Sequence, residues 1–138
     1  MNFRDELQKR ILIGEGAMGT LLYTTGVDTC FEELNIINPE LVKDIHRAYI
    51  RAGADIIQTN TYGANHFKLK RYGLENQVST INREAVKIAK RVATDNTFVF
   101  GTIGATRGLR NSDISLEEIQ RAFREQLFSL LIENPDGI

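Results

Sequence analysis

The sequence predicts an α/β fold in which buried parallel strands alternate with helices. Three long segments carry apolar residues at helical spacing, and short, wholly apolar runs lie between them. Apolar runs without alternation are typical of strands that are covered on both faces, as in parallel sheets. Their order along the chain, strand then helix three times over, is that of repeated crossover units with right-handed connections.

Three apolar runs are the predicted strands, and a fourth strand is expected to begin at the last residues. Small polar residues or glycine follow the runs and end them. The runs are residues 11–13, 56–57 and 98–100, and the fourth strand starts at 136–138.

Local signals mark where the predicted helices begin and end. Asn38 followed by Pro39 is a favourable cap and first-turn pair, and Gly53 ends that helix. Ser115 with Glu118 forms a capping-box pattern at the start of the last helix. The predicted helical segments are residues 39–52, a short one at about 66–72, 78–92 and 115–131.

Composition excludes several classes of protein. The formal net charge is -1, and the 17 basic and 18 acidic residues are well mixed, so no basic surface for nucleic acid is expected. No apolar run approaches the roughly 20 residues of a membrane helix. A single cysteine excludes an internal disulfide framework, and the first residues do not resemble a signal peptide. A cytoplasmic location is therefore expected.

Two architectures fit the alternation: an open doubly wound sheet and a closed eight-stranded barrel. A barrel needs about 250 residues, so this chain would form about half of one. The inner face and edge strands of a half barrel lack partners. The runs around Ile11, Ile57 and Val99 are then expected to meet water, and self-association through the exposed edges is expected. No linker divides residues 1–138, so a single domain unit is predicted.

The segment GEGAMG at residues 14–19 matches the G-x-G-x-x-G pattern and follows a predicted strand. A dinucleotide site would also need an acidic residue at the end of the second strand. Glu32 and Glu33 come before that strand, which ends instead in residues 59–61, Thr-Asn-Thr. An NAD-dependent oxidoreductase is therefore the weaker alternative, and a tight glycine turn after a strand is the simpler interpretation.

Small polar residues follow every predicted strand, at residues 15–16, 59–61 and 101–106. The carboxyl ends of parallel strands meet at one edge, where ligands bind. A carboxylate can hold an ammonium group, and glycine lets backbone N–H groups approach a ligand, so this edge suits an amino acid. Polar loop starts are common in α/β proteins, so a purely structural role stays open. A purely structural role also stays open for Arg107 and Arg110, whose side chains could instead bind an anion.

Metal-ligating residues are few. Cys30 is the single cysteine, and His46 and His66 are the two histidines. A catalytic zinc site keeps three protein ligands, and no close-spaced cluster of such residues occurs. His46 is predicted on the polar side of its helix, and Cys30 is predicted to pack in a loop.

Five segments of the sequence form an ordered set: GEGAMGT (14–20), CFEELN with NPE (30–35 and 38–40), AGADIIQTNTYGA (52–64), FGTIG (100–104) and PDGI (135–138). In this order they resemble the first strand and its loop, the next loop and helix start, the second strand and its end, the third strand, and the entry into the fourth strand of the homocysteine S-methyltransferase family. They also resemble the first module of cobalamin-dependent methionine synthases and of bifunctional homocysteine S-methyltransferase/methylenetetrahydrofolate reductases. The matches cover essentially the whole chain.

The resemblance implies a (β/α)8 TIM barrel, of which residues 1–138 are the N-terminal portion: three βα units and the start of the fourth strand. It implies transfer of a methyl group to the thiolate of homocysteine, giving methionine. In the family, zinc held by three cysteines deprotonates that thiol and leaves it nucleophilic. The partners implied are homocysteine and a small-molecule donor, which is a sulfonium or ammonium compound, methyl-folate or methyl-cobalamin.

The resemblance also implies the site residues. Glu15 stands where the family usually has aspartate, and Thr102 and Ala105 replace its serine and proline. Catalytic residues and zinc ligands are expected beyond residue 138, so the chain alone is expected to lack zinc-dependent catalysis. A non-catalytic amino-acid-binding or scaffold domain is the alternative. The substrate-binding residues implied are Glu15, Gly16, Ala17, Thr20, Asn60, Thr61 and Gly104.

Overall fold

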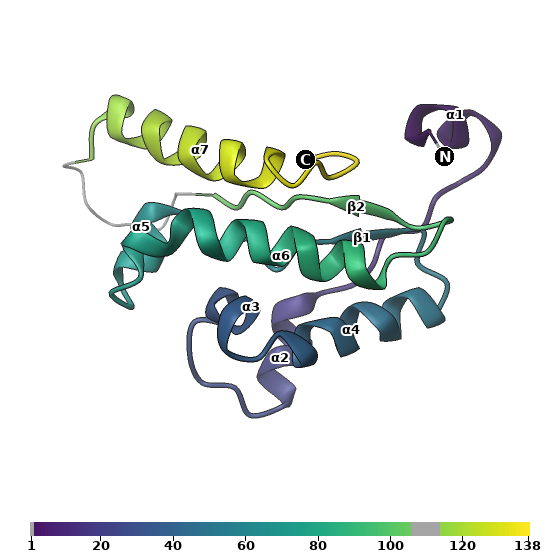
Figure 1. Cartoon of the computed structure of the whole chain (residues 1–138), viewed down its shortest axis with the longest axis horizontal. Helices are drawn as coiled ribbons and strands as arrows, with labels where there is room; N and C mark the ends of the chain where they lie inside the picture. The colour runs from purple at the N-terminus through teal and green to yellow at the C-terminus, as the bar shows by residue number, and fades with distance from the viewer. Residues whose placement is uncertain (1, 106–113) are drawn as a thin grey trace.

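Residues 2–105 and 114–138 are described by a computed structural model, in which three long helices lie side by side against a small parallel sheet (Figure 1). The chain is mixed α/β, as predicted. The elements are α1 (Phe3–Lys9), α2 (Met18–Thr24), η1 (Phe31–Glu33), α3 (Leu34–Ile37), α4 (Pro39–Arg51), β1 (Ile56–Gln58), α5 (His66–Lys70), η2 (Glu75–Gln77), α6 (Val78–Val92), β2 (Phe98–Phe100) and α7 (Leu116–Leu131).

The sheet grows in the order of the sequence. Strands β1 and β2 pair in parallel, with Ile57 opposite Val99. Parallel bridges join Gly14 to the start of β1 and Gly137 to the end of β2. In an open dinucleotide-binding sheet the fourth strand lies beside the first. Here the fourth segment pairs beyond the third, which does not fit that alternative.

The predicted long helices and their caps are confirmed. The Asn38 side chain accepts from the backbone of Leu41 at the start of α4. Ser115 and Glu118 form the capping box of α7. Among the helices of the described ranges, none has the length and apolar character needed to cross a bilayer. The cytoplasmic location stays a prediction.

Two expectations about the apolar runs are wrong. Ile57 and Val99 do not meet water, because Ala89 of α6 packs against them in a buried cluster. The first run does not form a strand of its own, since it pairs only at Gly14, where the bridge to Ile56 lies. Ile11 in this run is 89% exposed, as expected for an edge without a second neighbour.

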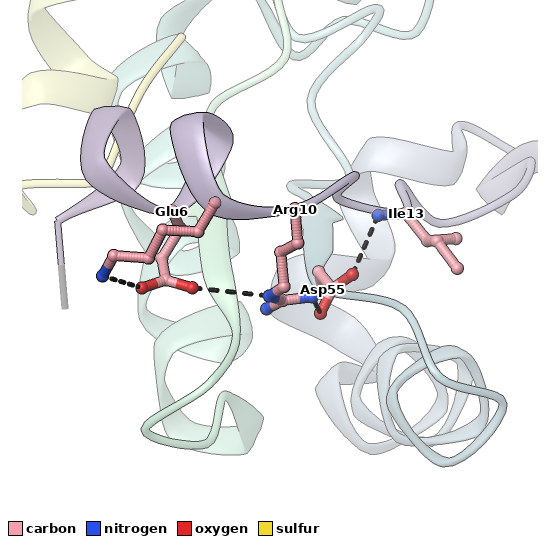
Figure 2. A network of polar contacts seen from close by, with 5 residues as sticks. Glu6, Arg10, Ile13 and Asp55 are labelled. Carbon is pink, nitrogen blue, oxygen red and sulfur yellow. Dashed lines mark hydrogen bonds and ion pairs between the residues drawn. The ribbon is translucent and has the colours of Figure 1, made fainter.

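The short helix α1, which the sequence analysis did not predict, packs on β2 and is tied to Asp55, the residue before β1 (Figure 2). The Phe3 ring meets the rings of Phe98 and Phe100 edge-on, at centroid distances of 5.2 and 4.8 Å. Arg10 Nη1 lies 2.8 Å from Asp55 Oδ1, and the N–H of Ile13 donates to Asp55 Oδ2 at 2.9 Å. Asp55 therefore joins α1, the first segment and β1.

Replacing Asp55 by asparagine isolates the contribution of its charge. The Ile13 N–H, and next the Arg10 guanidinium, hold the pKa of this carboxyl below its usual value. We expect Asp55→Asn to lower the free energy of unfolding at neutral pH by about 1–2 kcal/mol. A lowered folded-state pKa stabilises the fold above the ordinary aspartate pKa, and this stabilisation is lost as pH falls through the lowered value.

Denaturant titrations at a series of pH values measure this effect. The difference between wild type and Asp55→Asn should therefore shrink on acidification. A difference that stays constant down to acidic pH would contradict the assignment.

Candidate functional site

A cavity of about 300 Å³ opens at the carboxyl ends of the parallel segments. Three loops form it: the turn after Gly14, the segment after β1 and the residues after β2, together with the short turn around Phe31. Its lining residues are Glu15, Gly16, Ala17, Met18, Gly19, Phe31, Glu32, Gln58, Thr59, Asn60, Thr61, Tyr62 and Thr102.

Five of the seven residues implied as substrate-binding line this cavity, namely Glu15, Gly16, Ala17, Asn60 and Thr61. Thr20 lies on α2 with an exposed side chain and is not part of the lining. Gly104 is buried behind Tyr62 rather than in the cavity wall, and a Cβ there would collide with the Tyr62 carbonyl oxygen. The binding roles of all seven residues stay predictions.

Glu15 has a buried carboxylate, only 2% exposed, with both oxygens engaged by the chain. Oε1 accepts the N–H of Gln58 at 2.7 Å, and Oε2 lies 3.3 Å from Nδ1 of His46. The expectation that His46 faces solvent from the polar side of its helix is wrong, since its exposure is 0%. The prediction used helical spacing alone, which does not reveal that the partner of His46, Glu15, lies on a different segment.

Asn60 and Thr61 use their side chains to fix the loop after β1. The Asn60 amide donates to the Phe31 carbonyl at 2.7 Å and to Asn35 Oδ1 at 3.2 Å. The Thr61 hydroxyl donates to the Thr102 carbonyl at 2.7 Å. Both residues are nearly inaccessible to solvent. Their side chains therefore hold the cavity wall in shape.

Glu32 and Tyr62 belong to the cavity, although the sequence analysis did not select them. Glu32 Oε1 accepts the N–H of Gly63 at 2.6 Å, which ties the turn around Phe31 to the β1 loop. Tyr62 is 57% exposed, and Lys68 Nζ lies 4.4 Å from its ring centroid. Both lie inside the segments that carry the family resemblance, which is the signal that could have identified them.

The described residues supply no metal centre. Cys30 is buried beside Leu69 and Val78, as its predicted packing role requires. Burial, and next the charge of Glu32, raises the pKa of the Cys30 thiol to about 11, so it stays protonated at neutral pH. Within residues 2–105 and 114–138, no three His, Cys, Asp or Glu side chains are grouped to hold an ion. Arg107 and Arg110 lie outside the described residues.

Substitution of Gly104 tests how tightly the residues behind the cavity wall are packed. We expect Gly104→Ala to destabilise the fold by about 1–3 kcal/mol, because the added Cβ must displace the Tyr62 backbone. Gly14→Ala is the matched control, since a Cβ there meets nothing within 4 Å, and it should stay within about 0.5 kcal/mol of wild type. Thermal melting of both variants measures the effect, and equal losses would contradict the described packing.

Comparisons with known proteins identify the family of the chain. Residues 12–138 match the model of the homocysteine S-methyltransferase family. The methionine synthases of Mycobacterium tuberculosis (strain ATCC 25618 / H37Rv) and Mycobacterium leprae (strain TN) are each 34% identical over 149 residues, which cover 97% of this chain and 12% of each relative.

Solved structures of a homocysteine methyltransferase share the fold of this chain. The metallated form of the homocysteine methyltransferase MmuM from Escherichia coli superposes with a TM-score of 0.78 at 24% identity, covering 96% of this chain and 54% of that one. Its oxidized form gives a TM-score of 0.77 at 26% identity, covering 96% and 53%. This chain thus spans about half of the solved relative and a small part of the methionine synthases. On the family match over residues 12–138, the chain belongs to the homocysteine S-methyltransferase family.

Proposed function

We propose that this chain provides the amino-acid-binding part of a homocysteine S-methyltransferase, built as consecutive units of a (β/α)8 barrel. The observation that carries the proposal is the cavity at the carboxyl ends of parallel segments, which is where barrel enzymes bind their substrates. The order of the segments supports a barrel, because each pairs with the next in sequence. Helices α4 and α6, which follow successive segments, pack against the same sheet face.

The chemistry of the cavity suits a thiol-bearing amino acid. Glu15 and Glu32 give it carboxylates, and no lysine, arginine or histidine is part of its described lining. A substrate ammonium group would be attracted to these carboxylates. Met18 and Phe31 offer apolar surface to the methylene groups. The backbone of Gly16, which carries no side chain, is open to a substrate carboxylate.

Zinc is the metal that the family resemblance implies, and the described residues do not fit it. The single thiol is buried with a raised pKa, and no group of three ligands is present in the described part of the chain. We therefore assign this chain substrate binding and no step of sulfur activation. The proposed transferase reaction is methylation of the homocysteine sulfur, with the methyl donor left open between sulfonium, ammonium, folate and cobalamin compounds.

Isothermal titration calorimetry tests the binding role. We expect L-homocysteine to bind without added zinc, and 4-mercaptobutyrate, which lacks the amino group, to bind about 10-fold more weakly. Titration with NADH and nicotinamide fluorescence gives the counter-test. Equal affinity for the two thiols would contradict the carboxylate role, and saturable NADH binding would favour the oxidoreductase alternative.

A methyl-transfer assay of the 138-residue chain tests the division of roles. With zinc, homocysteine and a panel of methyl donors, we expect no more methionine than in a metal-free control, because the described residues offer no metal centre. Zinc-dependent turnover well above that control would refute the argument. Homocysteine binding without turnover is equally expected of the non-catalytic amino-acid-binding alternative, so the same assay on any longer protein that contains these 138 residues separates the two.

A further inference from the structure

His46 lies on α4, behind the cavity rather than in its wall. Its ring is fully buried, and Nδ1 lies 3.3 Å from Oε2 of Glu15. Nε2 has no hydrogen-bond partner in the described part of the chain. Burial of a polar ring is unfavourable unless its nitrogens are paired. The contact with Glu15 is therefore the polar interaction on which the placement of this ring depends.

Glu15 extends this contact to the sheet. Its second oxygen accepts the N–H of Gln58 at 2.7 Å, and Gln58 Oε1 in turn accepts the Thr102 hydroxyl at 3.2 Å. Glu15, Gln58 and Thr102 all line the cavity, and they lie at or just after the carboxyl ends of three successive parallel segments, Gln58 being the last residue of β1. One hydrogen-bonded chain, His46–Glu15–Gln58–Thr102, therefore joins α4 to the carboxyl ends of all three segments.

A second contact from α4 fixes the loop of residues 15–17, to which Glu15 belongs. The Tyr49 hydroxyl donates to the carbonyl of Ala17 at 3.1 Å. A Cβ on Gly16 would lie 2.7 Å from that hydroxyl, so the loop and the tyrosine are in close contact. With His46 and Tyr49 on one side of it, the loop of residues 15–17 is held from outside the cavity.

We propose that His46 is a positioning residue for homocysteine binding, which it supports by holding the Glu15 carboxylate against the backbone of Gln58. A glutamate side chain has three rotatable bonds, so an unpaired carboxylate would turn away and leave the Gln58 N–H without a partner. Held at both oxygens, it keeps lone pairs free for a substrate ammonium group at one fixed place in the cavity wall. This inference rests on the proposed function, because it assigns His46 a part in binding that substrate.

Two variants of His46 separate positioning from simple packing. Asparagine places its amide nitrogen close to the position of Nδ1 and can still donate to Glu15, whereas glutamine places its amide close to Nε2 and cannot. Calorimetry should show that His46→Gln raises the Kd for L-homocysteine about 10-fold, and that His46→Asn stays within about 3-fold of wild type. His66→Gln is the matched control, since His66 lies on α5 away from the cavity lining, and its Kd should be unchanged.

The amide proton of Gln58 gives a readout that needs no ligand. In ¹H–¹⁵N spectra of the ligand-free protein its resonance should move in His46→Gln and stay near its wild-type position in His46→Asn. If wild type does not bind homocysteine, the proposed function fails, and this spectral comparison still decides whether His46 positions Glu15.

Equal weakening in both variants, or wild-type affinity in both, would overturn the inference. Thermal melts show whether each variant is folded. If His46→Gln does not fold, His46→Asn alone tests the inference. A folded His46→Asn protein with wild-type affinity and an unmoved Gln58 resonance supports the positioning role. Lost affinity or a moved Gln58 resonance in that variant overturns it.

Discussion

Carboxylates that take the place of main-chain carbonyls hold the edges of this sheet together. The first segment has one regular bridge to β1, but Asp55 accepts its Ile13 N–H at one end. Glu15 accepts the Gln58 N–H at the other end. On the far edge, Asp136 accepts the N–H of Val99 at 2.8 Å. Because backbone N–H groups near a core must be paired, these three side chains complete ladders that would otherwise lack acceptors.

Buried polar side chains of the helices likewise support the loop after β1, which forms part of the cavity wall. Asn82 of α6 donates to the Ala64 carbonyl at 2.8 Å, and Gln126 of α7 donates to the Thr61 carbonyl at 2.7 Å. The helices therefore reach under the β1 loop and hold its carbonyls. Each of these amides is buried, so loss of one would leave an unpaired group where water does not reach. A loop supported in this way needs no strand structure to stay in place.

Much of the fold could be predicted, because the long helices carry their own signals. Apolar stripes predicted α4, α6 and α7, cap signals marked the starts of α4 and α7, and parallel strands were inferred from runs such as residues 98–100. The short helices α1 and α2 were not predicted, because seven residues give too little periodicity and their stability comes from contacts such as Phe3 on Phe98. The first apolar run, residues 11–13, was predicted as a strand. It lies at an edge of the sheet with only one neighbour and does not form a regular strand.

The site was predicted in part, and the reasons differ between residues. Strand-end polarity and the family resemblance identified Glu15, Asn60 and Thr61 as neighbours in space. Nothing in the local pattern around His46 indicated burial, since its partner is 31 positions away in sequence. Glu32 was passed over as a loop residue, because its link to Gly63 exists only after the chain has folded back.

The sequential pairing of the parallel segments has a consequence for how the molecule can be assembled. Each of the four segments except the first pairs with the one made just before it, after a crossover of about 40 positions, so none of these pairings closes a loop longer than one crossover. As a nascent chain leaves the ribosome, every new unit can dock on a surface that already exists. Growth of this kind leaves two edges of unpaired backbone groups, the outer edge of the first segment and the edge that the newest segment presents, and these are the surfaces that a chaperone would have to cover.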